Sequence, residues 1–315
     1  MTKVLRVGVA GAGVFGGYHA NKYKQAADAG IAVEFIGIYD LDKSRAEALA
    51  GTHGVTAFSG DELEAFLAKL DAVTIATPAF AHAGVAKKAL AAGVHVYSEK
   101  PLATTVEDGQ AMVDLAVEKG LVLACGHQER TMFEAMGLYD VPEKPLRLEA
   151  VRNGTASTRN LDVSVVLDLM VHDLDLALSL SGSVPGGLKA SGKRRIDEGY
   201  KATGADEVVA EIDFENGMTA SFEASRMAAE RKRTMRLVYP SGEVAIDFLA
   251  RTFGNTTPFA LNADFADAAI AKDPLGTSVF RFLETVLGKR ARPLCTGEEA
   301  LRALDLALAV DEDVA

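Results

Sequence analysis

An aspartate and a histidine four residues apart, Asp168 and His172, stand in an apolar stretch that predicts a helix over residues 165–180. Residues four apart on a helix share a face, so the carboxylate can fix the imidazole tautomer and stabilise its charged form. Such a pair suits proton transfer to or from a substrate hydroxyl. Asp175 falls within one turn of His172. A structural pair on a solvated helix face is the competing interpretation.

A second group of polar residues, Ser98, Glu99 and Lys100, ends an apolar segment and is followed by Pro101. In parallel sheets, ligands bind beyond the carboxyl ends of the strands. A lysine at such a place can donate a hydrogen bond to a substrate hydroxyl or to a cofactor ribose. Pro101 also allows the peptide bond before it to be cis. An ordinary solvated surface lysine is the alternative.

A glycine-rich turn directly follows the first apolar segment and precedes a helical pattern; its residues are Gly11, Ala12, Gly13, Val14, Phe15 and Gly16. In a dinucleotide-binding unit, the first glycine allows a tight turn and the second lets the backbone approach a pyrophosphate. The third glycine permits close packing of helix and strand. The free N–H groups of the helix N-terminus then face the phosphates.

Asp40 ends the second apolar segment, where this fold places the acid that binds the adenosine ribose. A carboxylate there accepts hydrogen bonds from the ribose hydroxyls and repels a 2′-phosphate. The sequence therefore predicts NAD as the cofactor, with NADP less favoured. Lys43 and Arg45 follow closely and would soften that preference, and capping of the next helix is another role open to Asp40.

The elements that must position these residues alternate along the first 125 residues. The pattern predicts strands over residues 5–10, 33–39, 72–76, 94–97 and 121–125, separated by helices. Continuous apolar strands that alternate with helices are typical of a parallel sheet covered on both faces. We therefore expect an α/β fold whose N-terminal domain is a doubly wound Rossmann domain over residues 1–125.

The alternation of strands and helices changes after residue 126. Strands are expected over residues 146–153, 207–214, 218–224 and 234–239, with turn sequences between the later ones. Short turns join antiparallel strands, so residues 126–315 are expected to form an antiparallel α+β domain. Two helices, over residues 274–287 and 298–310, close the chain, and the last is expected to be able to pack back on the first domain.

Composition limits the classes of partner. The chain has 315 residues, of which 49% are hydrophobic and 24% charged, and its formal net charge is -11. Nucleic acid and anionic membrane surfaces repel so acidic a protein. Two cysteines without a Cys/His cluster argue against a disulfide framework and a structural metal site. No apolar run reaches the roughly 18 residues of a membrane span, and no signal-peptide pattern is present, so a cytoplasmic protein is expected.

The order of these motifs resembles the Gfo/Idh/MocA family of oxidoreductases over nearly the whole chain. The motifs are the glycine-rich turn, the acid that ends the second strand, Thr77-Pro78 after the third, Glu99-Lys100-Pro101, and Asp168 with His172. The resemblance implies an NAD-dependent dehydrogenase acting on a secondary hydroxyl or carbonyl of a sugar or cyclitol. It also implies that the sheet of residues 126–315 is open, mainly antiparallel and serves substrate binding and oligomerisation, so a homodimer or homotetramer is expected.

The resemblance also implies roles for individual residues. His172 is the expected acid/base, Asp168 assists it, and Lys100 positions substrate and cofactor and stabilises a developing alkoxide. Thr77, Pro78 and His82 match the segment that borders the cofactor ribose and nicotinamide. The cofactor-binding set is therefore Gly11, Gly13, Val14, Phe15, Gly16, Asp40, Thr77, Pro78, His82, Glu99 and Lys100.

The segment Gly126-His127-Gln128-Glu129-Arg130 resembles one found in UDP-N-acetylhexosamine 3-dehydrogenase-like members of the family. Those members often continue Arg-Phe-Asn-Pro, whereas Thr131 and Met132 follow here. A nucleotide-sugar substrate is therefore the alternative to a free sugar or cyclitol. Candidate substrate contacts are Arg130, Arg152, Arg159 and Asp175. A third reading, of another class, is an NAD-binding sensor without catalysis.

Overall fold

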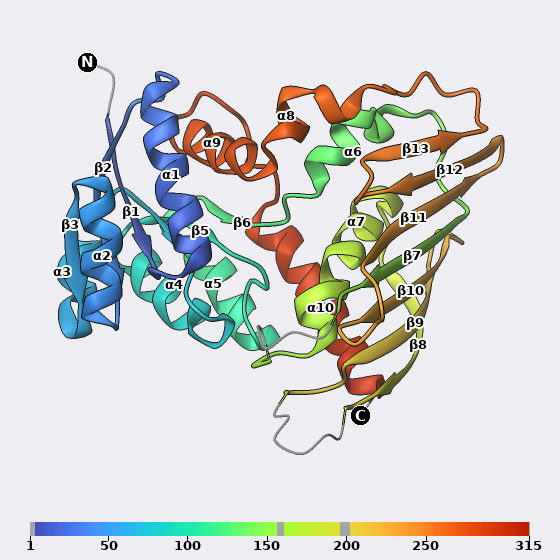
Figure 1. Ribbon diagram of the computed structural model, residues 1–315, viewed down its shortest axis with the longest axis horizontal. Coiled ribbons are helices and arrows are strands. Elements are labelled where there is room, and N and C mark those ends of the chain that lie inside the picture. Colours follow the sequence, from blue (N-terminus) through green and yellow to red (C-terminus); the bar gives the residue numbers. More distant parts are fainter. Residues whose placement is uncertain (1–3, 156–160, 196–201, 315) are drawn as a thin grey trace. The chain divides into compact units, whose positions relative to one another are not determined.

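The chain divides into two compact units in the computed structural model, which describes residues 4–155, 161–195 and 202–314 (Figure 1). Unit 1 comprises Met1–Gln128 and Asp273–Leu301, and unit 2 comprises Glu129–Lys272 and Arg302–Ala315. Sequence reasoning put a single boundary after residue 125. In the structure the boundary lies after Gln128, and a second segment, Asp273–Leu301, also belongs to unit 1. Each unit is described by itself.

Unit 1 is built on a six-stranded parallel sheet in the order β3-β2-β1-β4-β5-β6. This is the strand order of a doubly wound Rossmann domain, and the predicted fold class is confirmed. The strands are β1 (Leu5–Ala10), β2 (Val33–Asp40), β3 (Thr56–Ser59), β4 (Ala72–Ile75), β5 (His95–Ser98) and β6 (Leu123–Cys125). The strand order reverses between β1 and β4, where ligands bind in such sheets.

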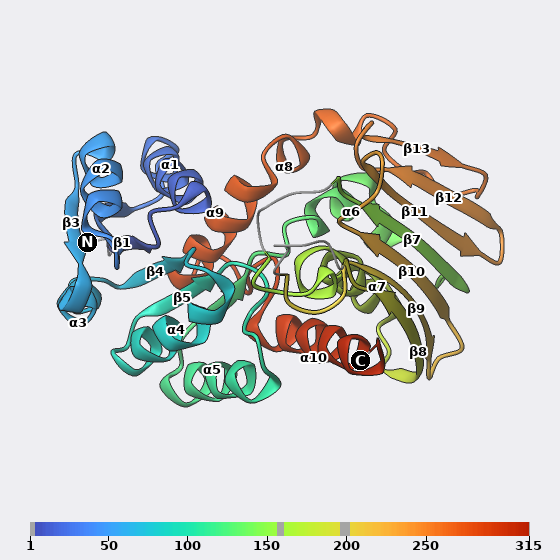
Figure 2. The ribbon, with the colours of Figure 1, turned by 60° about the horizontal axis from the view of Figure 1, so that its bottom comes forward.

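Helices cover both faces of this sheet. Figure 2 shows α1 and α2 on one face and α4 and α5 on the other. The helices of unit 1 are α1 (Val14–Asp28), α2 (Lys43–His53), α3 (Leu63–Leu67), α4 (His82–Ala91), α5 (Val106–Lys119) and α9 (Pro274–Val286). Helix α10 (Gly297–Val314) begins in unit 1 and continues in unit 2.

The late helix α9 joins unit 1 because its apolar side completes the core. Val279, Phe282 and Leu283 are fully buried in one cluster with strand residues such as Val7 and Val9. Their spacing of three and four residues is that of a single helix face. The views agree that α9 lies beside α1 (Figures 1 and 2).

Unit 2 is built on a seven-stranded sheet in the order β13-β12-β11-β7-β10-β9-β8. Only the β7–β10 pair is parallel and the others are antiparallel. The strands are β7 (Arg147–Asn153), β8 (Pro185–Lys193), β9 (Glu207–Phe214), β10 (Thr219–Ser225), β11 (Lys232–Tyr239), β12 (Gly242–Asp247) and β13 (Thr252–Asn255). The expected open, mainly antiparallel sheet is confirmed.

One face of this sheet is packed on the helices of unit 2: α6 (Arg130–Met136), a π-helical segment (Val166–Met170) that runs into α7 (Val171–Ser181), α8 (Ala269–Lys272) and the end of α10. Strand β9 alternates buried and exposed side chains, as expected for a strand with one solvent-exposed face. None of the helices in the described ranges is long and apolar enough to cross a membrane.

Candidate active site

Two of the three glycines of the turn after β1 have no room for a side chain. Gly11 has a φ of +104°, and a Cβ there would lie 2.5 Å from the carbonyl oxygen of Ala76. At Gly16, a Cβ would lie only 1.8 Å from the carbonyl oxygen of Gly11. Gly11 therefore allows the turn to pass the end of β4, and Gly16 lets α1 pack against the turn, as the sequence predicted.

Gly13 differs from the other two glycines because a Cβ there would meet nothing within 4 Å. It is the N-cap of α1, no side chain caps the helix, and the first turn carries no acidic residue. Val14 and Phe15 are exposed on that turn. An uncapped N-terminus beside an open glycine presents N–H groups and a positive dipole end, which fits the pyrophosphate of a dinucleotide.

Asp40, at the end of β2, is linked to the glycine turn. Its Oδ2 accepts a hydrogen bond from the N–H of Ala12 at 2.7 Å, and its Oδ1 accepts one from Asp42 at 2.8 Å. Helix α2 is capped by Asp42 instead, which accepts from Ser44 and Arg45. A carboxylate has about four acceptor positions, so Asp40 keeps capacity for two ribose hydroxyls.

The loop after β4 carries a polar atom suited to a ligand. The Oγ1 of Thr77 is buried and has no hydrogen-bond partner among the described residues. Buried polar groups are almost always satisfied, so a cofactor hydroxyl or amide fits this position. Together with the open Gly13, this atom shows that the residues present suit a dinucleotide.

His82, at the start of α4, is 2% exposed and connects two loops. Its Nε2 lies 2.9 Å from the carbonyl oxygen of Thr77, and its Nδ1 lies 2.7 Å from that of Pro101. Burial lowers the pKa of His82, and the two carbonyl groups oppose that effect. His82 thus holds together the loops that follow β4 and β5.

The turn after β5 contains a cis peptide bond between Lys100 and Pro101, as the sequence allowed. Glu99 is buried, and its Oε1 lies 2.7 Å from Nε2 of the fully buried His19. The N–H of Lys100 donates to Oε2 of Glu99 at 3.3 Å, and Nε2 of Gln128 donates to Oε1 at 3.3 Å. Lys100 itself is half-buried. Glu99 therefore anchors the backbone that carries Lys100.

The charge of Glu99 is stabilised within unit 1. Burial alone raises the pKa of this carboxyl, but the hydrogen bond and charge of His19, with the charge of Lys100, hold the pKa below its ordinary value. The sequence analysis placed Glu99 beside the cofactor and did not single out His19. Its signal is its position three residues after Gly16, on the same helix face.

In unit 2, the predicted helix around Asp168 and His172 differs from a regular α-helix. Asp168 lies in the π-helical segment, and His172 lies in the first turn of α7; both are half-buried. The segment is held by Ser164, whose Oγ accepts the N–H of Leu167 at 3.1 Å and donates to Asp311 at 2.5 Å. Single π turns within helices are rare and are frequent at functional sites.

Two buried arginines of unit 2, Arg152 and Arg130, form ion pairs with carboxylates that include Asp173 and Asp175 of α7. Arg152 is 1% exposed and donates to both oxygens of Asp173 and both oxygens of Glu129, at 2.5–2.8 Å. Although burial alone lowers the pKa of a guanidinium, these two carboxylates hold the pKa of Arg152 well above its usual value. Arg152 is therefore enclosed by protein and we do not propose it as a substrate ligand.

Arg130 and Asp175 form the second pair. The Nε and Nη2 atoms of Arg130 donate to the two carboxylate oxygens of Asp175 at 2.8 and 2.6 Å, and both residues are buried. This bidentate geometry gives them a structural role. Of the other predicted substrate contacts, Arg159 lies outside the described residues.

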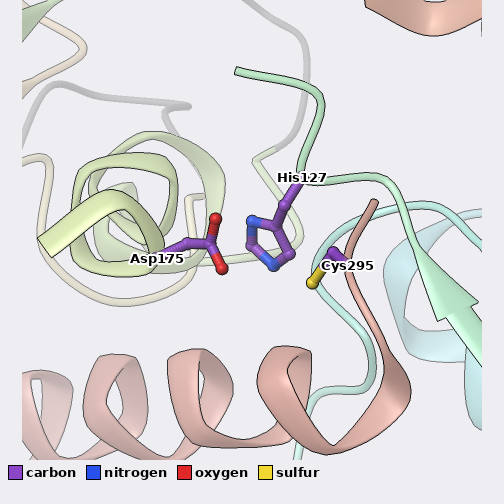
Figure 3. A group of neighbouring side chains, drawn as sticks. All are labelled: His127, Asp175 and Cys295. Carbon is purple, nitrogen blue, oxygen red and sulfur yellow. The ribbon is translucent and has the colours of Figure 1, made fainter. Parts of the chain in front are cut away.

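Figure 3 draws three further side chains of metal-binding types, His127, Asp175 and Cys295. His127 and Cys295 belong to unit 1, and Asp175 belongs to unit 2. Because the Asp175 carboxylate is already neutralised by Arg130, a cation there would displace a buried ion pair. We propose no metal site on these residues.

Comparison with known proteins identifies the family to which both parts of the chain are similar. Residues 5–127 match the oxidoreductase family with an NAD-binding Rossmann fold, GFO_IDH_MocA, and residues 132–245 match the GFO/IDH/MocA C-terminal domain. The chain is 34% identical to a UDP-N-acetylglucosamine 3-dehydrogenase of Acidithiobacillus ferrooxidans over 314 residues, covering 97% of this chain and 96% of that protein.

Solved structures resemble the whole chain. The structure of the A. ferrooxidans UDP-N-acetylglucosamine 3-dehydrogenase has a TM-score of 0.87 and covers 99% of this chain and 98% of its own. The WlbA dehydrogenase of Bordetella pertussis, solved with NADH and UDP-GlcNAcA, has a TM-score of 0.86 at 20% identity and covers 99% and 95% of the two chains, which shows a shared fold. An inositol 2-dehydrogenase of Rhizobium meliloti is 27% identical over 71% of this chain and 69% of its own.

Proposed function

The chain belongs to the Gfo/Idh/MocA oxidoreductase family, and on this premise we propose that it moves a hydride between NAD and a secondary hydroxyl or carbonyl of a sugar-like substrate. The observation that carries the proposal is the glycine turn at the point where the strand order reverses. There, an uncapped helix N-terminus, an open Gly13 and the buried Oγ1 of Thr77 offer a dinucleotide the groups it needs.

The proposed cofactor preference rests on Asp40. Its carboxylate is held by two backbone N–H groups and keeps acceptor capacity for ribose hydroxyls. The same charge would repel a 2′-phosphate, which favours NAD over NADP. Of the cations nearby on α2, Lys43 pairs with Glu47 and Arg45 pairs with Asp42, so their charges are partly offset.

The proposed chemistry assigns a role to three residues. NAD supplies the hydride acceptor. His172 takes the proton of the substrate hydroxyl, Asp168 stabilises the resulting imidazolium, and Lys100 stabilises the developing alkoxide. Glu99 and His19 act through Lys100 by anchoring its backbone.

We propose a nucleotide sugar of the UDP-N-acetylhexosamine kind as the favoured substrate class. The support is similarity along the full chain to a UDP-N-acetylglucosamine 3-dehydrogenase, whereas the inositol 2-dehydrogenase relative matches over a shorter range and at lower identity. A free sugar or cyclitol is the competing substrate class.

We also propose a cytoplasmic homodimer or homotetramer. Both cysteines are buried free thiols, as is common in reducing compartments. The outer face of the unit 2 sheet carries the exposed apolar side chain of Val209 among charged residues, and this face is the proposed surface for symmetric association.

His172→Ala tests the assignment of the acid/base. We expect kcat to fall by about 100-fold or more, with NAD affinity unchanged, because only proton transfer is lost. Ser179→Ala, on the same helix α7, is the matched control and should keep full activity. Steady-state kinetics and NAD titration measure both. Wild-type kcat in the histidine variant would refute the role.

A further inference from the structure

A second arginine of unit 2 lies on the same sheet face as the buried Arg152. Strand β11 runs antiparallel to β7, and Arg233 stands directly opposite Arg152 in the register. Side chains alternate along a strand. Met235 and Leu237, at alternate positions from Arg233, are buried, whereas Lys232 and Arg236 are exposed. Arg233 therefore points to the inner, helix-covered face, where it is half-buried.

The guanidinium of Arg233 is not satisfied by protein. Both oxygens of Glu129 and of Asp173 accept hydrogen bonds from Arg152. Within the described ranges, the backbone carbonyl of Arg233 accepts from the N–H of Phe248, but its guanidinium makes no hydrogen bond or ion pair. A guanidinium has five N–H donors, so this half-buried side chain keeps donors that a ligand can use.

The electrostatic surroundings of Arg233 favour an added anion. Burial lowers the pKa of Arg233, and the charges of Arg152 and Arg231 lower it further, against the opposing charges of Glu129 and Asp173. Arg231 is exposed and comes just before β11. The guanidinium groups of Arg231 and Arg233 repel each other, and a phosphate or carboxylate bound between them would reduce that repulsion.

The place of Arg233 in unit 2 relates it to the proposed chemistry. Asp173, whose charge acts on Arg233, directly follows His172 in the first turn of α7. The cluster of Arg152, Asp173 and Arg233 therefore lies at the end of α7 that carries the proposed acid/base. An oxyanion held there would lie at the same end of α7 as His172.

We propose that Arg233, assisted by Arg231, binds an oxyanion of the substrate: the diphosphate of a nucleotide sugar or the carboxylate of a sugar acid. This inference rests on the proposed function and names the group that the site recognises. The sequence favoured Arg152 and Arg159 for an anion and Arg130 as a further substrate contact, but Arg152 pairs with Glu129 and Asp173, and Arg130 pairs with Asp175.

Binding of two probes to the NAD-loaded protein tests the proposal by calorimetry. UDP represents the nucleotide diphosphate and glucuronate represents the sugar acid. We expect Arg233→Met to weaken binding of one probe by about tenfold or more, and Arg233→Lys to restore part of it. Lys232→Gln removes the same charge from the neighbouring residue on the opposite face, and it should bind like wild type. NAD affinity should be unchanged throughout.

The two probes separate the sources of the oxyanion, because the one whose binding depends on Arg233 identifies it. Arg231→Gln, at an exposed position, should weaken the same probe to a smaller degree and does not depend on the core. Unchanged binding of both probes in Arg233→Met, or in Arg231→Gln if the first variant does not fold, overturns the inference. NADH formation by the wild type from any member of a panel of UDP-sugars, neutral sugars and cyclitols separates such a failure from a failure of the proposed function.

Discussion

The polar side chains of the loops after β4 and β5 have two different roles. Some are available to a ligand, and others hold the loops in place. The sequence predicted Thr77, His82 and Glu99 beside the cofactor without separating these two roles. In the structure, the polar atoms of His82 and Glu99 contact other protein groups. The Oγ1 of Thr77, by contrast, has no partner in the described part of the chain. Spacing along a sequence identifies such residues but does not show which atoms are already used.

His82→Ala should loosen the loops after β4 and β5 together. A neutral imidazole donates one hydrogen bond, so the substitution would remove that bond and the buried ring that packs between the carbonyls of Thr77 and Pro101. We expect the KM for NAD to rise by about tenfold, equivalent to about 1.4 kcal/mol, with a smaller change in kcat. His53→Ala, at the end of α2, is the control. A KM for NAD at the wild-type value in the His82 variant would show that the loops do not need this link.

Glu99→Gln should change how the free energy of unfolding depends on pH. The pKa of Glu99 is lowered in the folded protein, so its contribution is fully present above the unfolded value of about 4.3. That contribution is lost as pH falls through the lower, folded pKa. The variant should be destabilised by about 1–3 kcal/mol at pH 7.

Urea unfolding at several pH values measures this effect. The difference in free energy of unfolding between wild type and Glu99→Gln should shrink as the pH falls below about 4. The hydrogen bond to His19 would gain nothing from the charge of Glu99 if that difference stayed constant over the whole range.

At the scale of elements, the strands and helices of unit 1 were largely predictable and those of unit 2 less so. Continuous apolar runs predicted β1, β2, β4 and β5 within one or two residues. Strand β8 was not predicted, because Pro185-Gly186-Gly187 is typical of a turn and few of its residues are buried. The π-helical segment was also not predicted, and Ser164, which comes shortly before it in sequence, bonds to Asp311, which is distant in the chain.

The glycine turn allows a matched pair of substitutions. Gly16→Ala should prevent stable folding, because its Cβ would overlap the carbonyl oxygen of Gly11. Gly13→Ala should fold with wild-type thermal stability, since its Cβ meets nothing in the protein, yet it should weaken NAD binding by about tenfold or more by filling the space of the pyrophosphate. Thermal unfolding and NAD titration check both. Tight NAD binding by Gly13→Ala would place the pyrophosphate elsewhere.

For the whole molecule, the sequence predicted two units and their fold classes but a single boundary between them. The local hydrophobic pattern of the sequence could not show that residues 273–301 belong to unit 1. The sequence of an amphipathic helix such as α9 shows that the helix has an apolar face, but it does not show which hydrophobic core that face completes. The buried pairs of Arg130 and Arg152 were missed for the same reason, because their partners are 20 to 45 residues away in the sequence.

If the whole protein transfers a hydride to NAD, it must form NADH from a suitable substrate. The purified protein with NAD would be given UDP-N-acetylglucosamine, glucuronate, inositols and neutral sugars while the near-ultraviolet absorbance of reduced nicotinamide is followed. We expect absorbance to rise with UDP-N-acetylglucosamine or another member of the panel, and the rise to be lost in His172→Ala. Tight NAD binding without NADH formation from any of them would contradict the account and favour a nucleotide-binding sensor.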